Sequence, residues 1–154
     1  MFKYKMILYY YIISIHIIMG NKSSVNKIHY EDMQNAIKKN FIIINTLNKN
    51  EQMCLIQGTI NASEEEEKIN YYMNNNLSVN IVLYGKNNID ESVYKKYKQL
   101  INLGFINIYI YIGGLFEWLL LQDVYGHENF HTTTEELDIL KYKGQSRFHL
   151  LLTN

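Results

Sequence analysis

The sequence contains no proline and a single cysteine, Cys54, among its 154 residues. One cysteine excludes an intramolecular disulfide and a cysteine-rich zinc site, and it agrees with a reducing compartment. Neither sign of charge is in excess, because 15 lysines and arginines balance 15 aspartates and glutamates. Such a chain has no large-scale field that would attract nucleic acid or an acidic partner. We therefore expect no nucleic-acid partner.

Apolar side chains are abundant, since hydrophobic residues make up 47% of the sequence. This share argues against disorder, and the length fits one domain with its own core. We divide the chain into a hydrophobic leader, residues 1–24, and a folded domain, residues 25–154.

The leader allows two interpretations, of which the first is entry into a secretory pathway. Lys3 and Lys5 precede an apolar run from Met6 to Met19. The run is too short for a transmembrane helix, which needs ~20 apolar residues. Its length suits the hydrophobic region of a signal peptide, although no Ala-x-Ala-like cleavage site follows it. In this interpretation residues 1–19 direct secretory entry.

The second interpretation is N-myristoylation of a chain that starts at Met19. The sequence from Met19 to Ser24 matches the pattern Met-Gly-x-x-x-Ser/Thr, with Gly20 as the acceptor. One myristoyl chain binds membranes only marginally, so a second signal is needed, and Lys22 and Lys27 supply a weak one. We favour this interpretation, which predicts a cytoplasmic protein held weakly at the membrane face through Gly20.

Strand and helix patterns alternate along the remaining chain. Continuous apolar runs at 41–45, 80–84 and 107–112 have the composition of strands that are buried on both faces. Helix patterns lie between and after them, at 31–39, 91–103 and 115–122. The order predicts an α/β fold, a short and mainly parallel sheet with helices on both faces.

Two further helices are expected from capping signals. Ser63 precedes four consecutive glutamates, which suit the positive end of a helix dipole, so Ser63 is the expected N-cap. Near the C-terminus, Thr132 with Glu135, or Thr133 with Glu136, forms a capping box. A helix carrying Leu137, Ile139 and Leu140 is expected to follow.

A short motif resembles a zinc site but lacks its context. The segment from His127 to His131 matches His-Glu-x-x-His, which binds zinc when both histidines share one helix face and a third ligand comes from elsewhere. Gly126 precedes the motif and three threonines follow it, which is typical of a loop. We therefore expect a chance match and no bound metal.

The middle of the chain resembles a rhodanese domain. An apolar strand ending in Tyr84 is followed by a six-residue loop, then a helix that ends at Leu103-Gly104-Phe105. Another strand and a Gly113-Gly114 pair with Trp118 nearby complete the similarity, which spans about residues 28–122. The resemblance implies a rhodanese-like three-layer sandwich, with the last 30 or so residues as an extension.

The departures from the family concern its chemistry. The family strand ends in Tyr-Cys, and that cysteine is its nucleophile, but Gly85 stands at this position. The family loop often ends in arginine, whereas this loop ends in Asp90. The degenerate active-site loop consists of Gly85, Lys86, Asn87, Asn88, Ile89 and Asp90.

We therefore expect no catalytic residue in this loop. Its backbone amides could still bind an anion, but Asp90 and Glu91 bring two negative charges to the same helix start. We favour the interpretation that these carboxylates cap the helix and satisfy the loop internally. Cys54 lies outside the loop and is expected to be a small apolar residue.

Two function classes remain open. Resemblance to the rhodanese family, together with the absence of the family's nucleophile, implies a catalytically silent module. Such a module would act in protein interaction or regulation, with an unknown protein partner and no cofactor. The alternative is a sulfurtransferase, or a phosphatase of the same superfamily, that uses a non-canonical thiol such as Cys54 or a thiol of its partner.

Overall fold

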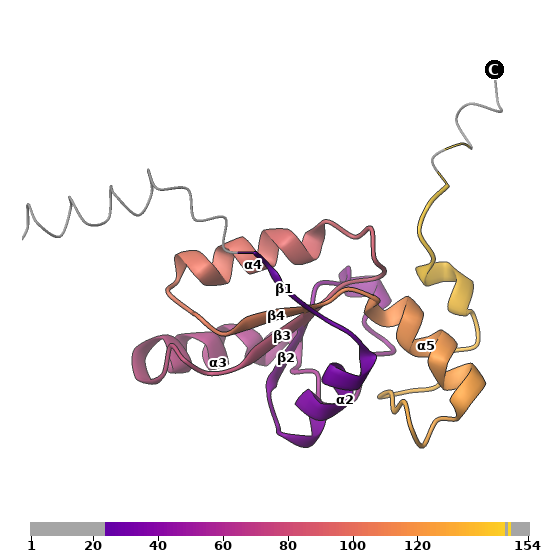
Figure 1. The fold of residues 1–154 in the computed structure, drawn as a ribbon, viewed down its shortest axis with the longest axis horizontal. Coiled ribbons are helices and arrows are strands. Elements are labelled where there is room, and N and C mark those ends of the chain that lie inside the picture. The colour runs from indigo at the N-terminus through magenta and orange to yellow at the C-terminus, as the bar shows by residue number, and fades with distance from the viewer. Residues whose placement is uncertain (1–23, 147, 149–154) are drawn as a thin grey trace, which may run out of the picture.

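A computed structural model describes residues 24–146 and 148 (Figure 1). Within them, four strands form one parallel sheet in the order β1-β4-β3-β2. The strands are β1 (Asn26–Ile28), β2 (Ile42–Asn45), β3 (Ile81–Tyr84) and β4 (Ile108–Tyr111). Ile42, Ile81 and Ile108 are aligned across three neighbouring strands, so the apolar runs of the sequence lie side by side.

Helices cover both faces of the sheet. They are α2 (Tyr30–Lys38), α3 (Ala62–Asn75), α4 (Ser92–Asn102) and α5 (Gly114–Tyr125), with short 3-10 turns η1 (Lys49–Glu51) and η2 (Ile139–Tyr142). Buried side chains of α2 and α5 share one core cluster, and those of α3 and α4 share the other. The three-layer α/β architecture expected from the sequence is therefore confirmed.

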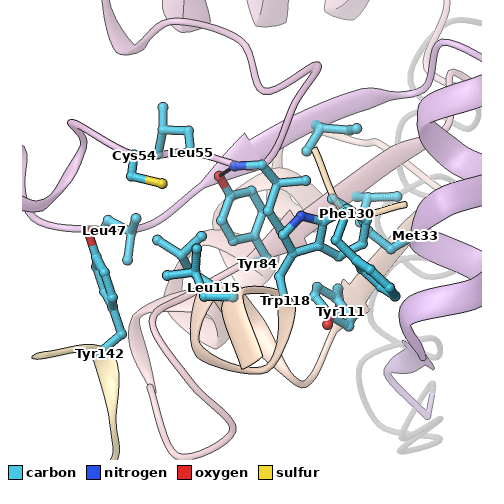
Figure 2. Close-up of a cluster of buried hydrophobic side chains, with 14 of the residues drawn as sticks. Met33, Leu47, Cys54, Leu55, Tyr84, Tyr111, Leu115, Trp118, Phe130 and Tyr142 are labelled. Atoms are coloured by element: carbon cyan, nitrogen blue, oxygen red, sulfur yellow. Dashed lines mark hydrogen bonds between the residues drawn. The ribbon is translucent and has the colours of Figure 1, made fainter. Parts of the chain in front are cut away.

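One face of the sheet carries an aromatic core (Figure 2). Trp118 of α5 packs edge-on against Tyr111 and Phe130, with ring centroids 6.1 and 5.0 Å apart. The Tyr84 hydroxyl accepts a hydrogen bond from the Ile56 amide at 3.2 Å and lies 2.9 Å from the Thr59 hydroxyl. These bonds satisfy the buried phenol and fix the segment after η1 against the sheet.

The other face carries an aliphatic core. Alternate residues of β2, β3 and β4 point into it and pack against Ile69 of α3 and against Val93 and Leu100 of α4. Phe105, which follows α4, completes this cluster. Because β2 and β3 are buried on both faces, their sequences are apolar runs and do not alternate.

The strand expectations are confirmed, but β1 was not predicted. The apolar runs at 41–45, 80–84 and 107–112 contain β2, β3 and β4 as neighbours. β1 has only three residues, and Asn26 and Lys27 are exposed, so the segment has no apolar run. It is a strand because it pairs with β4 at the edge of the sheet.

Two helix expectations were wrong. Helix α3 begins at Ala62 and its N-cap is Asn61, because the backbone is still extended at Asn61; Ser63 lies inside the first turn. The expected C-terminal helix is reduced to the single turn η2. Its capping threonines make tertiary contacts instead: the Thr133 hydroxyl accepts the Leu55 amide, and Thr132 forms an antiparallel bridge with Ile56.

The predicted acylation site lies outside the described residues. Residues 1–23, with the expected acceptor Gly20, have no structural description. Among the helices that are described, none is long and apolar enough to cross a membrane.

Candidate functional site

The loop after β3 lies at the carboxyl edge of the sheet, where α/β folds bind their ligands. Helix α5 begins directly against it: the Leu115 amide donates to the Gly85 carbonyl and the Phe116 amide to the Lys86 carbonyl, both at 3.0 Å. Gly114 makes this approach feasible. Its φ is +64°, and a Cβ there would lie 2.6 Å from the Gly85 carbonyl oxygen.

The carboxylate of Asp90 occupies the centre of the loop. One oxygen accepts the Lys86 amide at 2.8 Å, and the other accepts the Ser92 amide in the first turn of α4 at 2.9 Å. A Cβ built on Gly85 would lie 2.6 Å from that first oxygen. Asp90 therefore caps α4 and fills the space in which a side chain at position 85 would begin.

Glu91 does not share this role. It stands at the N-cap position of α4 but makes no side-chain capping bond, and it is exposed. The expectation that both carboxylates cap the helix holds for Asp90 and is wrong for Glu91, because the Ser92 amide already has Asp90 as its acceptor.

Lys86, the basic residue of the loop, is paired. Its ammonium forms an ion pair with Glu51 of η1, and both side chains are mostly shielded from water. The hydrogen bond from Lys86 is the main reason that the pKa of Glu51 lies below its usual value. An incoming anion would have to compete with Glu51 for the Lys86 charge.

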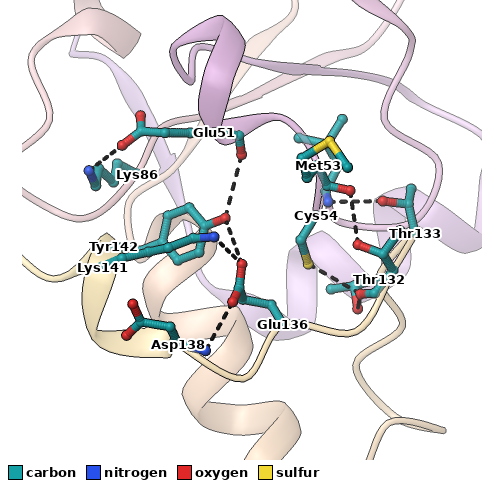
Figure 3. A network of polar contacts seen from close by, with 12 residues as sticks. Glu51, Met53, Cys54, Lys86, Thr132, Thr133, Glu136, Asp138, Lys141 and Tyr142 are labelled. Carbon is teal, nitrogen blue, oxygen red and sulfur yellow. Dashed lines mark hydrogen bonds and ion pairs between the residues drawn. The ribbon is translucent and has the colours of Figure 1, made fainter.

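The C-terminal segment closes one side of the loop (Figure 3). The buried Asn87 side chain donates to the Tyr142 carbonyl at 2.8 Å and accepts the Ile89 amide at 3.1 Å. The Tyr142 ring is fully buried, and its hydroxyl lies 3.4 Å from a carboxylate oxygen of Glu136. Residues after α5 thus form part of the site and are not a separate tail.

An open cleft of about 330 Å³ remains beside the loop. It is bounded by Thr46 to Asn48, Glu51, the loop with the start of α4, and Lys143 with Gln145 from the C-terminal segment. Three carboxylates, those of Glu51, Asp90 and Glu91, face two lysines, Lys86 and Lys143. The cleft is polar, with negative charge exceeding positive.

Cys54 lies outside this cleft, in the aromatic core. Its side chain is fully buried, and its thiol donates to the Thr134 carbonyl at 3.3 Å. Burial raises the pKa of this thiol, so it is protonated at neutral pH. The expectation that Cys54 is a small apolar core residue is confirmed.

The histidine motif follows α5 in a turn. His127 and His131 are exposed, with ring centroids 5.2 Å apart, and they do not share a helix. The expected loop context is confirmed. No three metal-ligating side chains come together anywhere in the described part of the chain.

Three residues of the site were not found from the sequence: Glu51, Tyr142 and Lys143. Glu51 and Tyr142 meet the loop from positions 35 and 55 residues away along the chain. No periodicity or short motif marks such a contact, because it depends on how distant segments pack.

No family model matches the sequence. No curated protein matches it either. Similarity is found with solved structures. The Alr3790 protein from Anabaena sp. has a TM-score of 0.51 at 18% identity, over 74% of this chain and 97% of that one. The BH2092 protein from Bacillus halodurans has a TM-score of 0.52 at 18% identity, over 73% and 81%.

A solution structure of Alr3790 is described as its rhodanese-like domain. It covers 79% of this chain and 92% of its own, at 19% identity and a TM-score of 0.48. The two neighbours with TM-scores above 0.5, Alr3790 and BH2092, support the α/β fold of the described residues. The described part of the chain therefore shares the fold of Alr3790, the protein whose solution structure is described as a rhodanese-like domain.

Proposed function

We propose that this domain is a catalytically silent rhodanese-like module that works by binding another protein. The observation that carries the proposal is the Asp90 carboxylate, which accepts two backbone amides beside Gly85. In an active loop of this fold, such amides would face a thiolate or an anionic substrate. Here the chain's own carboxylate takes that place.

The state of Cys54 supports the same conclusion. A sulfurtransferase or thiol phosphatase needs an exposed thiolate, since the thiolate is the nucleophile. Cys54 is fully buried and its pKa is raised. An anionic substrate would also meet a cleft in which carboxylates outnumber lysines.

The test is an assay for cyanide-dependent thiocyanate formation, with thiosulfate and with 3-mercaptopyruvate as donors, and an aryl phosphatase assay. We expect no activity above the uncatalysed rate from the wild type or from Cys54→Ala. Activity that is present in the wild type and absent in Cys54→Ala would reinstate the enzyme hypothesis. Capture of a sulfur-donating protein with a reactive cysteine would favour the variant in which the partner supplies the thiol.

We also propose that Gly20 is myristoylated and holds the domain weakly at the cytoplasmic membrane face. The proposal is supported by the match of residues 19–24 to the acylation pattern. Mass spectrometry of the native N-terminus is expected to find myristoyl-Gly20, and Gly20→Ala is expected to abolish both the acyl group and most membrane partition. A native chain that retains residues 1–18, or one cleaved after the apolar run, would contradict it and favour secretory entry.

A further inference from the structure

The amino edge of the sheet carries exposed aliphatic side chains. The loops from α3 to β3 and from α4 to β4 meet there, because the Ile106 amide donates to the Leu77 carbonyl at 3.2 Å and the Asn107 side chain donates to the Ser78 carbonyl at 2.8 Å. Ile106 is 63% exposed, and Leu77 and Leu103 are each 38% exposed. We call these three side chains the amino-edge patch.

Acidic residues are absent from the two chain segments that form this patch, although Glu65 and Glu66 of α3 line the same pocket as Leu103. No aspartate or glutamate occurs in residues 68–89 or in residues 92–116, which include the C-terminal ends of α3 and α4 and both loops. Lys98 on α4 and Lys27 on β1 are exposed. The acidic groups at the loop after β3 lie at the opposite, carboxyl edge. The loops at the amino edge therefore carry aliphatic side chains without a carboxylate of their own.

The described chain starts at the same edge. Asn26 pairs with Tyr109, so Ser24 and Val25 run beside the residues that lead into β4. In Figure 1 the start of β1 and the two loops lie to the left, away from the yellow C-terminal segment. Gly20 precedes Ser24 by four residues, a stretch of at most about 14 Å when fully extended.

We propose that the amino-edge patch is a membrane-docking face, which places Leu77, Leu103 and Ile106 against an anionic lipid bilayer. The assignment rests on the proposed acylation of Gly20 for its anchor, and it supplies the second signal that one myristoyl chain needs. Aliphatic side chains enter the headgroup boundary, while Lys27 and Lys98 are attracted to anionic lipid. The cleft beside Asp90, at the opposite edge of the sheet, then faces the cytoplasm.

The test is flotation with vesicles of phosphatidylcholine and phosphatidylserine. It uses the myristoylated chain that begins at Met19, the same chain unacylated, and the full 154-residue chain. We expect Ile106→Ser to lower partition about tenfold, as for the lost burial of one large aliphatic side chain. Leu137→Ser is the matched control, because Leu137 is 86% exposed in the C-terminal segment. It is expected to change nothing.

Two further measurements separate lipid from other occupants. Spin-labelled lipid is expected to broaden the amide resonances of Leu77, Leu103 and Ile106, but not that of Leu137. Lys98→Gln is expected to weaken binding to anionic vesicles about two- to fivefold and to leave binding to neutral vesicles unchanged. Equal partition of the Ile106→Ser and Leu137→Ser chains would overturn the proposal, and so would self-association that depends on Ile106 in the absence of vesicles.

Failure of the anchor and failure of the docking face give different results. If native Gly20 is not acylated, the proposed anchor is wrong, yet the unacylated chains still report on the patch. Residual partition that falls with Ile106→Ser, together with broadening at the patch, supports the docking face. A different result would refute the docking face and leave the proposed anchor intact: acylated wild-type and Ile106→Ser chains partition equally, and the patch resonances are not broadened.

Discussion

At the scale of single residues, Gly85 and Asp90 define the loop after β3. The carboxylate of Asp90 lies where a side chain at position 85 would begin, and it accepts the amide of Lys86. A new side chain at 85 and the native carboxylate therefore compete for one space. We therefore expect that a cysteine placed at position 85 alone does not give a working nucleophile.

The first prediction concerns a thiol placed at position 85. In a Cys54→Ala background, Gly85→Cys is expected to give a slowly reactive thiol and almost no thiocyanate, because Asp90 crowds the sulfur and raises its pKa through like charge. Gly85→Cys with Asp90→Arg is expected to react faster by at least tenfold, measured by thiol titration and thiocyanate formation. The Asp90→Arg change alone is the control. Equal reactivity of the single and double variants would show that Asp90 does not block the loop.

The second prediction concerns the Glu51–Lys86 pair. The folded-state pKa of Glu51 is lowered from 4.5, so its contribution to stability is present above the unfolded-state pKa and is lost as pH falls through the folded-state value. Denaturant unfolding from pH 6 to pH 3 is expected to show a steeper loss of stability for the wild type than for Glu51→Gln. Glu66→Gln, at an exposed position of α3, should keep the wild-type slope. Parallel curves for wild type and Glu51→Gln would contradict the pairing.

At the scale of elements, the contact between α5 and the loop depends on a close backbone approach. Gly114 has a positive φ, and its hydrogen is near the Gly85 carbonyl and the Asn87 amide. A side chain at this position would separate the two elements. Gly104, at the end of α4, also has a positive φ. A Cβ added there would have a methyl group of the flexible Leu77 side chain as its nearest neighbour, at 3.4 Å.

The third prediction uses that difference. Gly104→Ala is expected to cost about 1 kcal/mol of unfolding free energy, which is the strain of positive φ alone. Gly114→Ala is expected to cost about 3 kcal/mol or more, because its Cβ also meets backbone atoms that cannot move aside. Chemical denaturation of both variants measures the two costs. Similar losses would mean that the loop yields to the new methyl group.

The fourth prediction concerns the segment after α5. Tyr142→Ala is expected to cost about 3–5 kcal/mol, as for other buried aromatic side chains, and to loosen Asn87. Leu140→Ala, at an exposed position two residues away, is expected to cost less than about 0.5 kcal/mol. Thermal unfolding and hydrogen exchange at Asn87 provide the measurements. A small effect of Tyr142→Ala would show that the segment is dispensable for the domain.

At the scale of the whole molecule, two tyrosines of the sheet strands are buried in the core. Tyr84 and Tyr111 lie in the aromatic core, and burial raises the pKa of both phenols well above 10. Tyr111 donates to Glu117 at 2.7 Å, and the nearby carboxylate opposes its ionisation further. Ionisation of either phenol is therefore disfavoured while the core is intact.

The fifth prediction follows from that protection. A raised folded-state pKa gives stability that is complete below the unfolded-state pKa near 10 and is lost as pH rises above it. Phenolate absorbance and circular dichroism are therefore expected to change together for the last tyrosines above about pH 10. Tyr84→Phe and Tyr111→Phe are each expected to remove part of that joint transition. Full tyrosine ionisation with unchanged circular dichroism would contradict it.

The strands of the central sheet and the absence of a nucleophile at Gly85 follow from the sequence by itself. A strand that is buried on both faces has to be continuously apolar, so β2, β3 and β4 were identifiable without their neighbours. The identity of one residue after β3 decides whether a thiol is present there.

Only the tertiary structure decided how the site is filled and closed. Asp90 was recognisable as a capping residue, but that its carboxylate also occupies the space beside Gly85 follows from the folded loop. Glu51 and Tyr142 reach the loop across distant parts of the chain, and strand β1 exists through pairing alone. The C-terminal capping box fails as a helix signal because Leu55 and Ile56 engage its threonines. Local patterns report local backbone preferences, whereas these contacts are set by packing between segments that the sequence keeps far apart.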